Sequence, residues 1–159
     1  MIGATYPERI ALPASFIIKP LIFIGKPVLG KVSKLWTIQV SRKLLDRSGQ
    51  VIGVVVASVN PVYFEQVYKD VRLGPTGNIA LVGDDDIVRA EVIGGKSHGM
   101  GEALVLAQPD PDADAVSTAD QTSFIRTDAD GVRHVVVSQR IPGYPLRLMV
   151  ATTADWALT

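Results

Sequence analysis

The chain has 159 residues, of which 47% are apolar and 20% charged, a balance typical of a globular protein and not of a disordered one. It contains no cysteine, which excludes disulfides, zinc–thiolate sites and cysteine nucleophiles. The net charge of zero hides an asymmetry: residues 1–73 carry ten Lys or Arg against four Asp or Glu, whereas residues 74–159 carry six against twelve. No basic helix or aromatic–basic pattern accompanies the basic half, so nucleic acid is not an expected partner.

The most apolar stretch, residues 16–25, reads "FIIKPLIFIG". Lys19 and Pro20 interrupt it, and it is shorter than the roughly 20 residues that span a bilayer. The N-terminus also lacks the basic, apolar and small-residue order of a signal peptide. We therefore expect no signal or membrane segment within this chain, and any membrane link would come only through missing flanking helices.

Residues 21–59 are predicted to form strands. The first run is broken at Lys26-Pro27, which indicates an edge strand or a bent one. Residues 35–45 alternate, with Trp36, Ile38 and Val40 on one side. A turn at "DRSG" follows. Residues 50–59 are nearly continuous in β-branched side chains, which predicts a central strand buried on both faces.

A helix is predicted over residues 61–72. Asn60 suits the N-cap and Pro61 the first helical position. Apolar side chains recur at helical spacing and form one stripe: Phe64, Val67, Tyr68 and Val71. Gly74 and Pro75 end the helix.

The remaining residues predict a second set of strands. A hairpin is expected over residues 77–92 with its turn at 84–86, then a short helix within 94–107 and an exposed acidic loop over 108–121. Three strands follow, joined by turns at 128–131 and 142–144. Both halves of the chain place an Asp-x-x-Gly turn before a valine-rich strand. The expected fold class is therefore α/β (α+β), with two tandem antiparallel sheet units over residues 1–73 and 74–159.

Residues 23–90 resemble the extracytoplasmic PAS-like sensor domains of the PDC or double Cache class, and residues 123–152 resemble them more weakly. These domains lie at the N-terminus of bacterial membrane diguanylate cyclases and sensor histidine kinases. Four marks carry the resemblance. They are the Ile24-Gly25-Lys26-Pro27 step, Trp36 ahead of Ser41-Arg42, the Pro-x-Tyr-Phe start of the helix, and the Gly-x-Ile-Ala-Leu-Val hairpin.

The resemblance implies a membrane-distal unit over residues 1–73 and a membrane-proximal unit over 74–159. It implies a small organic acid or amino acid bound over a sheet, a periplasmic location, signalling through membrane helices and no enzymatic activity. A complete distal unit would begin with a long helix and two strands, so the distal unit is expected to be truncated. The turn where relatives carry Asp-Gly reads Asp85-Asp86 here.

Candidate ligand-binding residues lie on the predicted first sheet and on the helix. Arg42 is the first candidate, because a planar guanidinium can donate two parallel hydrogen bonds to a carboxylate. Trp36 suits a pocket wall, although a core position is favoured. The polar residues on apolar strands need hydrogen-bond partners if buried, with backbone or water favoured over a ligand. The full candidate set is Trp36, Gln39, Ser41, Arg42, Ser58 and Tyr63.

Catalytic motifs are missing from the sequence. It has no nucleophile elbow, phosphate-binding loop, dinucleotide fingerprint or His-Glu-x-x-His. The acidic run at residues 110–121 departs from a calcium loop at its sixth and twelfth positions. We therefore expect no catalytic residue, metal or cofactor. The alternative function is a ligand-free dimerisation module, because a sheet with few strands leaves edges open to a second copy.

Overall fold

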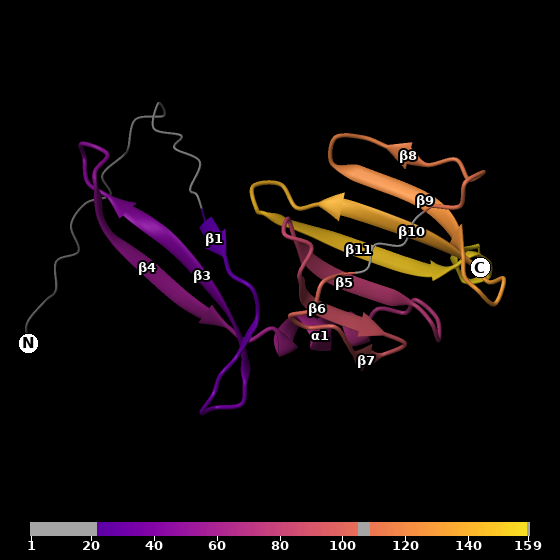
Figure 1. Cartoon of the computed structure of the whole chain (residues 1–159), viewed down its shortest axis with the longest axis horizontal. Coiled ribbons are helices and arrows are strands. Elements are labelled where there is room, and N and C mark those ends of the chain that lie inside the picture. The colour runs from indigo at the N-terminus through magenta and orange to yellow at the C-terminus, as the bar shows by residue number, and fades with distance from the viewer. Residues whose placement is uncertain (1–21, 105–108, 159) are drawn as a thin grey trace, which may run out of the picture.

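The computed structural model describes residues 22–104 and 109–158, and these fold into two antiparallel sheets joined by a helix (Figure 1). The predicted α+β class is confirmed. The expectations for residues 1–20 lie outside the described residues. One sheet comes from residues 22–59 and the other from residues 78–153. That the two sheets belong to independent units, over residues 1–73 and 74–159, stays a prediction.

The first sheet is built around its longest strand, β3. The strands β1 and β2 both pair with β3, and β4 pairs with it as well. The break between β1 and β2 falls at the predicted Lys26-Pro27 step. The four strands are β1 (Ile22–Ile24), β2 (Val28–Leu29), β3 (Trp36–Leu45) and β4 (Val51–Val59).

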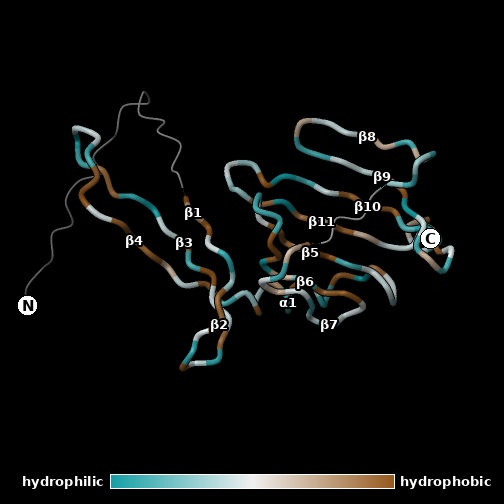
Figure 2. Tube along the Cα trace, in the orientation of Figure 1, coloured by the Kyte–Doolittle hydropathy of each residue, from teal (hydrophilic) through white to brown (hydrophobic). Residues whose placement is uncertain are grey.

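The prediction that residues 50–59 form a buried central strand is wrong. Among the described residues β4 pairs only with β3, so it is an edge strand. Val54, Val55 and Val56 are each more than half exposed, and Figure 2 shows apolar residues along β4. A β-branched run favours an extended backbone, but burial also requires a second neighbouring strand and a covering layer.

Helix α1 (Val62–Lys69) connects the two sheets. It begins one residue later than predicted and ends three residues earlier. The Asn60 side chain accepts a hydrogen bond from the N–H of Val62 at 3.0 Å, so Asn60 does contribute to the helix start. Phe64 and Tyr68 pack onto the second sheet, whereas Val67 stays exposed. Only part of the predicted apolar stripe is therefore used.

The second sheet has seven strands in the order β7-β6-β5-β11-β10-β9-β8. The predicted hairpin and the three C-terminal strands are confirmed. The predicted short helix is wrong for residues 96–104, which form β7 and turns. The strands are β5 (Asn78–Gly83), β6 (Val88–Ile93), β7 (Lys96–Ser97), β8 (Val116–Ser117), β9 (Gln121–Thr127), β10 (Arg133–Arg140) and β11 (Leu146–Thr153), and helix α2 (Ala154–Ala157) follows.

The protein core lies on the second sheet. Residues paired across antiparallel strands share a face, so Leu81, Ala90 and Leu148 lie on the face toward α1. Leu81, Ala90 and Leu146 form the buried cluster that Phe64 and Tyr68 cover. The opposite face also holds buried residues, among them Val136. The second sheet is thus packed on both sides.

Candidate functional site

The six residues predicted to bind a ligand are divided between the two faces of the first sheet and helix α1. Trp36 and Arg42 lie on one face of β3, while Gln39 and Ser41 lie on the other. Ser58 pairs with Gln39 and shares its face. Trp36 and Arg42 are six residues apart, about 20 Å along a strand. One amino-acid-sized molecule therefore cannot contact both of them.

Trp36 packs against the second half of the chain. A Cβ atom placed on Gly101 would lie 3.2 Å from the indole ring, and Gly101 has a φ of +81°. The indole therefore covers a glycine of the loop that follows β7. This contact agrees with the favoured interpretation of Trp36 as a packing residue, and its role toward a ligand stays a prediction.

The other predicted residues remain accessible. Within the described residues, the side chains of Gln39, Ser41, Arg42 and Ser58 form no hydrogen bond. Tyr63 is exposed on α1, and its ring meets that of Phe64 edge to face at 6.1 Å. These groups are free to bind, but the structure does not gather them into one pocket, and their ligand role stays a prediction.

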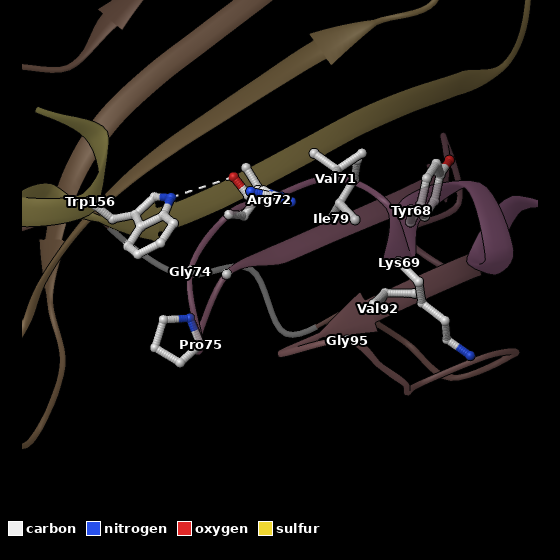
Figure 3. A pocket seen from close by; sticks show the side chains of 12 residues that line it. Tyr68, Lys69, Val71, Arg72, Gly74, Pro75, Ile79, Val92, Gly95 and Trp156 are labelled. Atoms are coloured by element: carbon white, nitrogen blue, oxygen red, sulfur yellow. Dashed lines mark hydrogen bonds between the residues drawn. The ribbon is translucent and has the colours of Figure 1, made fainter. Parts of the chain in front are cut away.

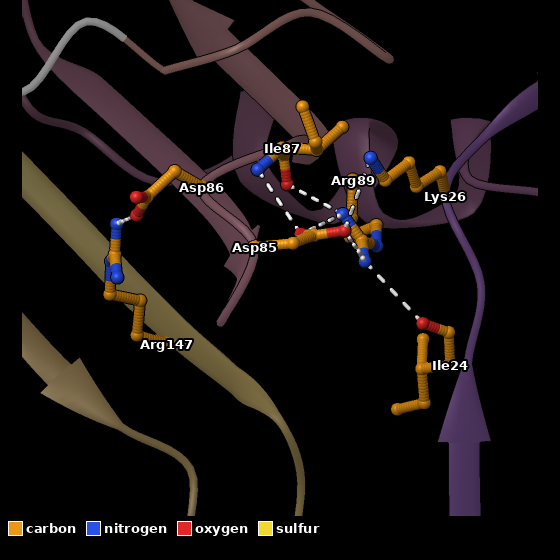
Figure 4. A network of polar contacts seen from close by, with 7 residues as sticks. All are labelled: Ile24, Lys26, Asp85, Asp86, Ile87, Arg89 and Arg147. Atoms are coloured by element: carbon orange, nitrogen blue, oxygen red, sulfur yellow. Dashed lines mark hydrogen bonds and ion pairs between the residues drawn. The ribbon is translucent and has the colours of Figure 1, made fainter.

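Arg89 forms the polar centre of the joint between the two sheets (Figure 4). Its buried guanidinium donates to both carboxylate oxygens of Asp85, at 3.0 and 3.2 Å, and to the carbonyl of Ile87 at 2.7 Å. It also donates to the carbonyl of Ile24 at 3.4 Å, at the end of β1. Lys26 lies 3.9 Å from Asp85. The joint thus ties the Ile-Gly-Lys-Pro step to the β5–β6 turn.

The charge on Asp85 follows from these contacts. Partial burial acts to raise the pKa of Asp85, but the hydrogen bonds from Arg89 and from the Ile87 N–H outweigh it, so the pKa is lowered. Asp85 therefore stays ionised opposite Arg89. Sequence reasoning missed Arg89, although a lone arginine between apolar residues in the predicted hairpin signals a charged partner.

One cavity, of about 330 Å³, lies where the end of α1, the α1–β5 linker and α2 meet (Figure 3). Tyr68, Ile79 and Trp156 give it apolar walls. The Trp156 indole N–H donates to the carbonyl of Arg72 at 3.4 Å, and the Thr152 hydroxyl donates to that of Leu73 at 2.7 Å. These bonds fix the linker against the second sheet. Burial raises the pKa of Tyr68 to about 12, so its phenol is neutral.

A second cavity, of about 360 Å³, lies on the opposite face of the second sheet. Its lining combines apolar side chains, hydroxyls and two arginines: Thr122, Phe124, Ser138, Arg140, Arg147 and Met149, with the β8–β9 turn at the rim. Sequence reasoning did not single out this set. The available signal was the turn predicted at residues 142–144, because such a turn brings Arg140 and Arg147 opposite each other.

Neither a metal site nor a membrane span is found in the part of the chain that the structure describes. No group of three or more His, Cys, Asp or Glu side chains is placed to hold a metal ion within residues 22–104 and 109–158. None of the helices in these ranges is long and apolar enough to cross a membrane. Asp110, the first residue of the acidic run, instead accepts hydrogen bonds from the N–H and hydroxyl of Thr127 at 2.8 and 2.7 Å.

Similarity to known proteins is found at the level of structure. No protein-family model and no curated protein sequence matches the chain. The extracellular domain of the candidate histidine kinase rpHK1S-Z16 matches with a TM-score of 0.59 and 27% identity, over 88% of this chain and 56% of that one. The extracellular domain of the candidate histidine kinase mmHK1S-Z2 gives 0.60 and 12%, over 87% and 52%.

A third solved structure is the ligand-binding domain of the Pseudomonas fluorescens chemoreceptor CtaA in complex with L-leucine. It matches with a TM-score of 0.55 and 17% identity, over 87% of this chain and 56% of that one. The chain has the fold of an extracytoplasmic sensor domain. The predicted resemblance is thereby confirmed at this level, while these neighbours give no support for a diguanylate cyclase in particular. The chain spans about half the length of each of these three structures.

Proposed function

We propose that the chain is the sensing part of a bacterial signal-transduction receptor, that it lies outside the cytoplasm, and that it binds a small organic acid or amino acid. The observation that carries the proposal is the match to the extracellular domain of rpHK1S-Z16 at 27% identity over 88% of the chain. The CtaA domain, which has the same fold, was solved with L-leucine, L-isoleucine and L-alanine. Because these neighbours are sensor domains and not catalytic ones, we propose no enzymatic activity.

Signalling in such a module would work by differential binding. A ligand that binds one arrangement of the two sheets more tightly than another shifts the population toward it. The units proposed for residues 1–73 and 74–159 meet at the Arg89 joint, at the contact of Trp36 with Gly101, and where α1 packs on the second sheet. A change at either sheet would therefore reach the other through these connections.

The proposal is tested by calorimetry of the whole chain with a panel of amino acids and small organic acids. Saturable binding of at least one compound is expected. Arg42→Ala tests the leading sequence-predicted residue, with Arg47→Ala in the neighbouring turn as the matched control. An unchanged affinity in Arg42→Ala would remove Arg42 from the site. No binding of any compound would remove the proposed function.

A ligand-free dimerisation module is the second candidate, and β4 favours it. The strand is nine residues long and carries no charged residue. Within the described residues it pairs on one edge only. Open edges of this kind recruit further strands, and charged residues are the usual means of blocking them. We propose that a second copy pairs along β4 to form a homodimer.

Sedimentation velocity over a range of concentrations tests this homodimer. A dimer that dissociates in Val55→Lys, but not in a Val82→Ala variant of the second sheet, is the expected result. A monomer at every concentration would count against dimerisation through β4.

A further inference from the structure

We propose that the second cavity, on the face of the second sheet turned away from α1, binds an α-amino acid with an apolar side chain. The inference rests on the proposed sensing function and gives it a site. That site lies in the C-terminal half of the chain and shares no residue with the six that the sequence singled out.

The floor of the cavity is a continuous patch of three neighbouring strands. Ser138 on β10 pairs with Thr122 on β9 and with Met149 on β11, and one row further along Arg140 pairs with Arg147. Paired residues share a face, and positions two apart along a strand share it as well. The regular ladder thus holds the hydroxyls and both guanidinium groups on one surface.

The two arginines provide a carboxylate site. Arg140 Nη2 lies 3.1 Å from Asp84 Oδ1, and Arg147 Nη2 is paired with Asp86 Oδ1 (Figure 4). Each aspartate holds one terminal nitrogen, and the remaining guanidinium N–H groups have no partner among the described residues. The Arg147 side chain is only 19% exposed, which favours a defined geometry. Two guanidinium groups, each held by an aspartate and each with free N–H donors, suit the α-carboxylate of a ligand.

At the rim of the cavity, the carboxylate of Asp120 can pair with the ammonium group of the ligand. Asp120 lies in the β8–β9 turn, and its carbonyl accepts the backbone N–H of Arg140 at 2.7 Å, which places the turn beside the arginine row. Within the described residues its carboxylate forms no hydrogen bond. Three aspartates against two arginines leave this region with one excess negative charge. A simple anion is therefore disfavoured, whereas a zwitterion finds partners for both of its charges.

The rest of the lining selects an apolar side chain of moderate size. Phe124 and Met149 provide the apolar surface of the cavity. Its volume of about 360 Å³ is at the lower end of the range for small-molecule sites, about 300–1,000 Å³. An apolar cavity of about 150 Å³ holds six carbon atoms as benzene. A leucine-sized ligand, also with six carbons, therefore fits with space for a few waters.

The ligand class is tested by calorimetry of the whole chain with three probes of one shape. L-leucine has both charges, L-leucinamide lacks the carboxylate, and 4-methylpentanoate lacks the ammonium. We expect L-leucine to bind on the order of tenfold or more tightly than either analogue, since each loses a charge-assisted contact. Equal binding of L-leucinamide would overturn the role of the arginines, and equal binding of 4-methylpentanoate would overturn that of Asp120.

The site itself is tested by substitution. Arg147→Ala and Arg140→Ala are each expected to weaken L-leucine binding, by on the order of tenfold or more for Arg147. Arg133→Ala, on the opposite face of β10, is the matched control. If the Arg147→Ala protein does not fold, the site is tested with the two variants at exposed positions, Arg140→Ala and Asp120→Asn. Wild-type binding that survives in both of these variants overturns the site and leaves the sensing function standing. If the wild-type protein binds no compound in the panel of amino acids and organic acids, both the site and the sensing function are overturned.

Discussion

The two sheets are made of similar strands and differ in what surrounds them. Val82 on β5 is completely buried, whereas Val55 on β4, in a strand with four further valines, is 51% exposed. The second sheet has α1 on one face, and the loop after β7 pairs along the outer edge of β6. The first sheet has no comparable layer among the described residues. Strand formation follows from local preference, whereas burial depends on which other elements lie over the strand.

The first sheet is buried mainly where it meets the second. Ile38 is its only buried strand residue within the described part of the chain, and Gly25 and Pro27 are buried beside it. These residues lie near Trp36 and the joint around Arg89. The position of the first sheet therefore depends on contacts supplied by the second sheet.

The largest expected effect comes from removing that joint. In Arg89→Met, Asp85 loses its guanidinium and the carbonyls of Ile24 and Ile87 lose a donor. Losing the charge-assisted hydrogen bonds to Asp85, whose side chain is 35% exposed, together with the donors to two carbonyls costs about 3 kcal/mol. We expect a loss of this order in the free energy of unfolding, measured in urea. Lys26→Ala, 3.9 Å from Asp85 and exposed, is expected to cost under about 0.5 kcal/mol. Equal losses would show that Arg89 does not hold the joint.

The same valine substitution in each sheet tests the comparison directly. Val82→Ala removes two buried methyl groups and leaves a cavity, which should cost about 2 kcal/mol. Val55→Ala should cost under about 0.5 kcal/mol, because its side chain is largely in water. Urea unfolding of both variants gives the difference. A comparable loss in Val55→Ala would mean that the Val55 side chain is covered in solution, contrary to the structure.

Two glycines with nearly equal backbone angles sharpen the comparison further. Gly49 lies in the β3–β4 turn with a φ of +84°, and Gly74 lies in the linker with a φ of +82°. Alanine is strained at both positions. At Gly74 its Cβ would also lie 3.0 Å from the Trp156 indole, while at Gly49 nothing lies within 4 Å. Gly74→Ala should therefore cost about 1 kcal/mol more than Gly49→Ala. Equal thermal shifts would contradict the packing of Trp156 on the linker.

The smallest expected effect is a loss in the free energy of unfolding at low pH. The native pKa of Asp85 is below its ordinary value of 3.8, so the unfolded state binds a proton first as the pH falls. The stability that Asp85 contributes is present above its unfolded pKa and is lost as the pH falls through the native pKa. Wild type should therefore lose more unfolding free energy than Asp85→Asn between about pH 5 and pH 3, by on the order of 1 kcal/mol or less. Parallel pH profiles of the two proteins would contradict this.

The local structure could be predicted from the sequence because its causes are local. Gly49 and Gly131 supply the positive φ angles that the two Asp-x-x-Gly turns require. The alternation around Trp36 gave the correct faces of β3, and the Asp84–Asp86 turn closes the β5–β6 hairpin.

The layers and the cavities could not be predicted because they depend on distant segments. The exposure of β4 reflects which strands pair beside it, and the run of valines carries no information on that point. The pairing of Arg140 with Arg147 was within reach, since both flank a predicted turn. The cavity beside them was not, because its rim comes from the β8–β9 turn, in a stretch interpreted as an exposed loop.

The contact between Trp36 and Gly101 has a consequence for evolution. The indole occupies the space where any side chain at position 101 would begin, and the positive φ there independently favours glycine. The two positions are separated by more than sixty residues but share one small volume. In a set of homologous sequences, the residue at 36 and the residue at 101 should therefore vary together, with a large aromatic ring kept wherever glycine is kept. Pairs in which only one of them has changed should mark homologues whose two sheets meet at a different angle.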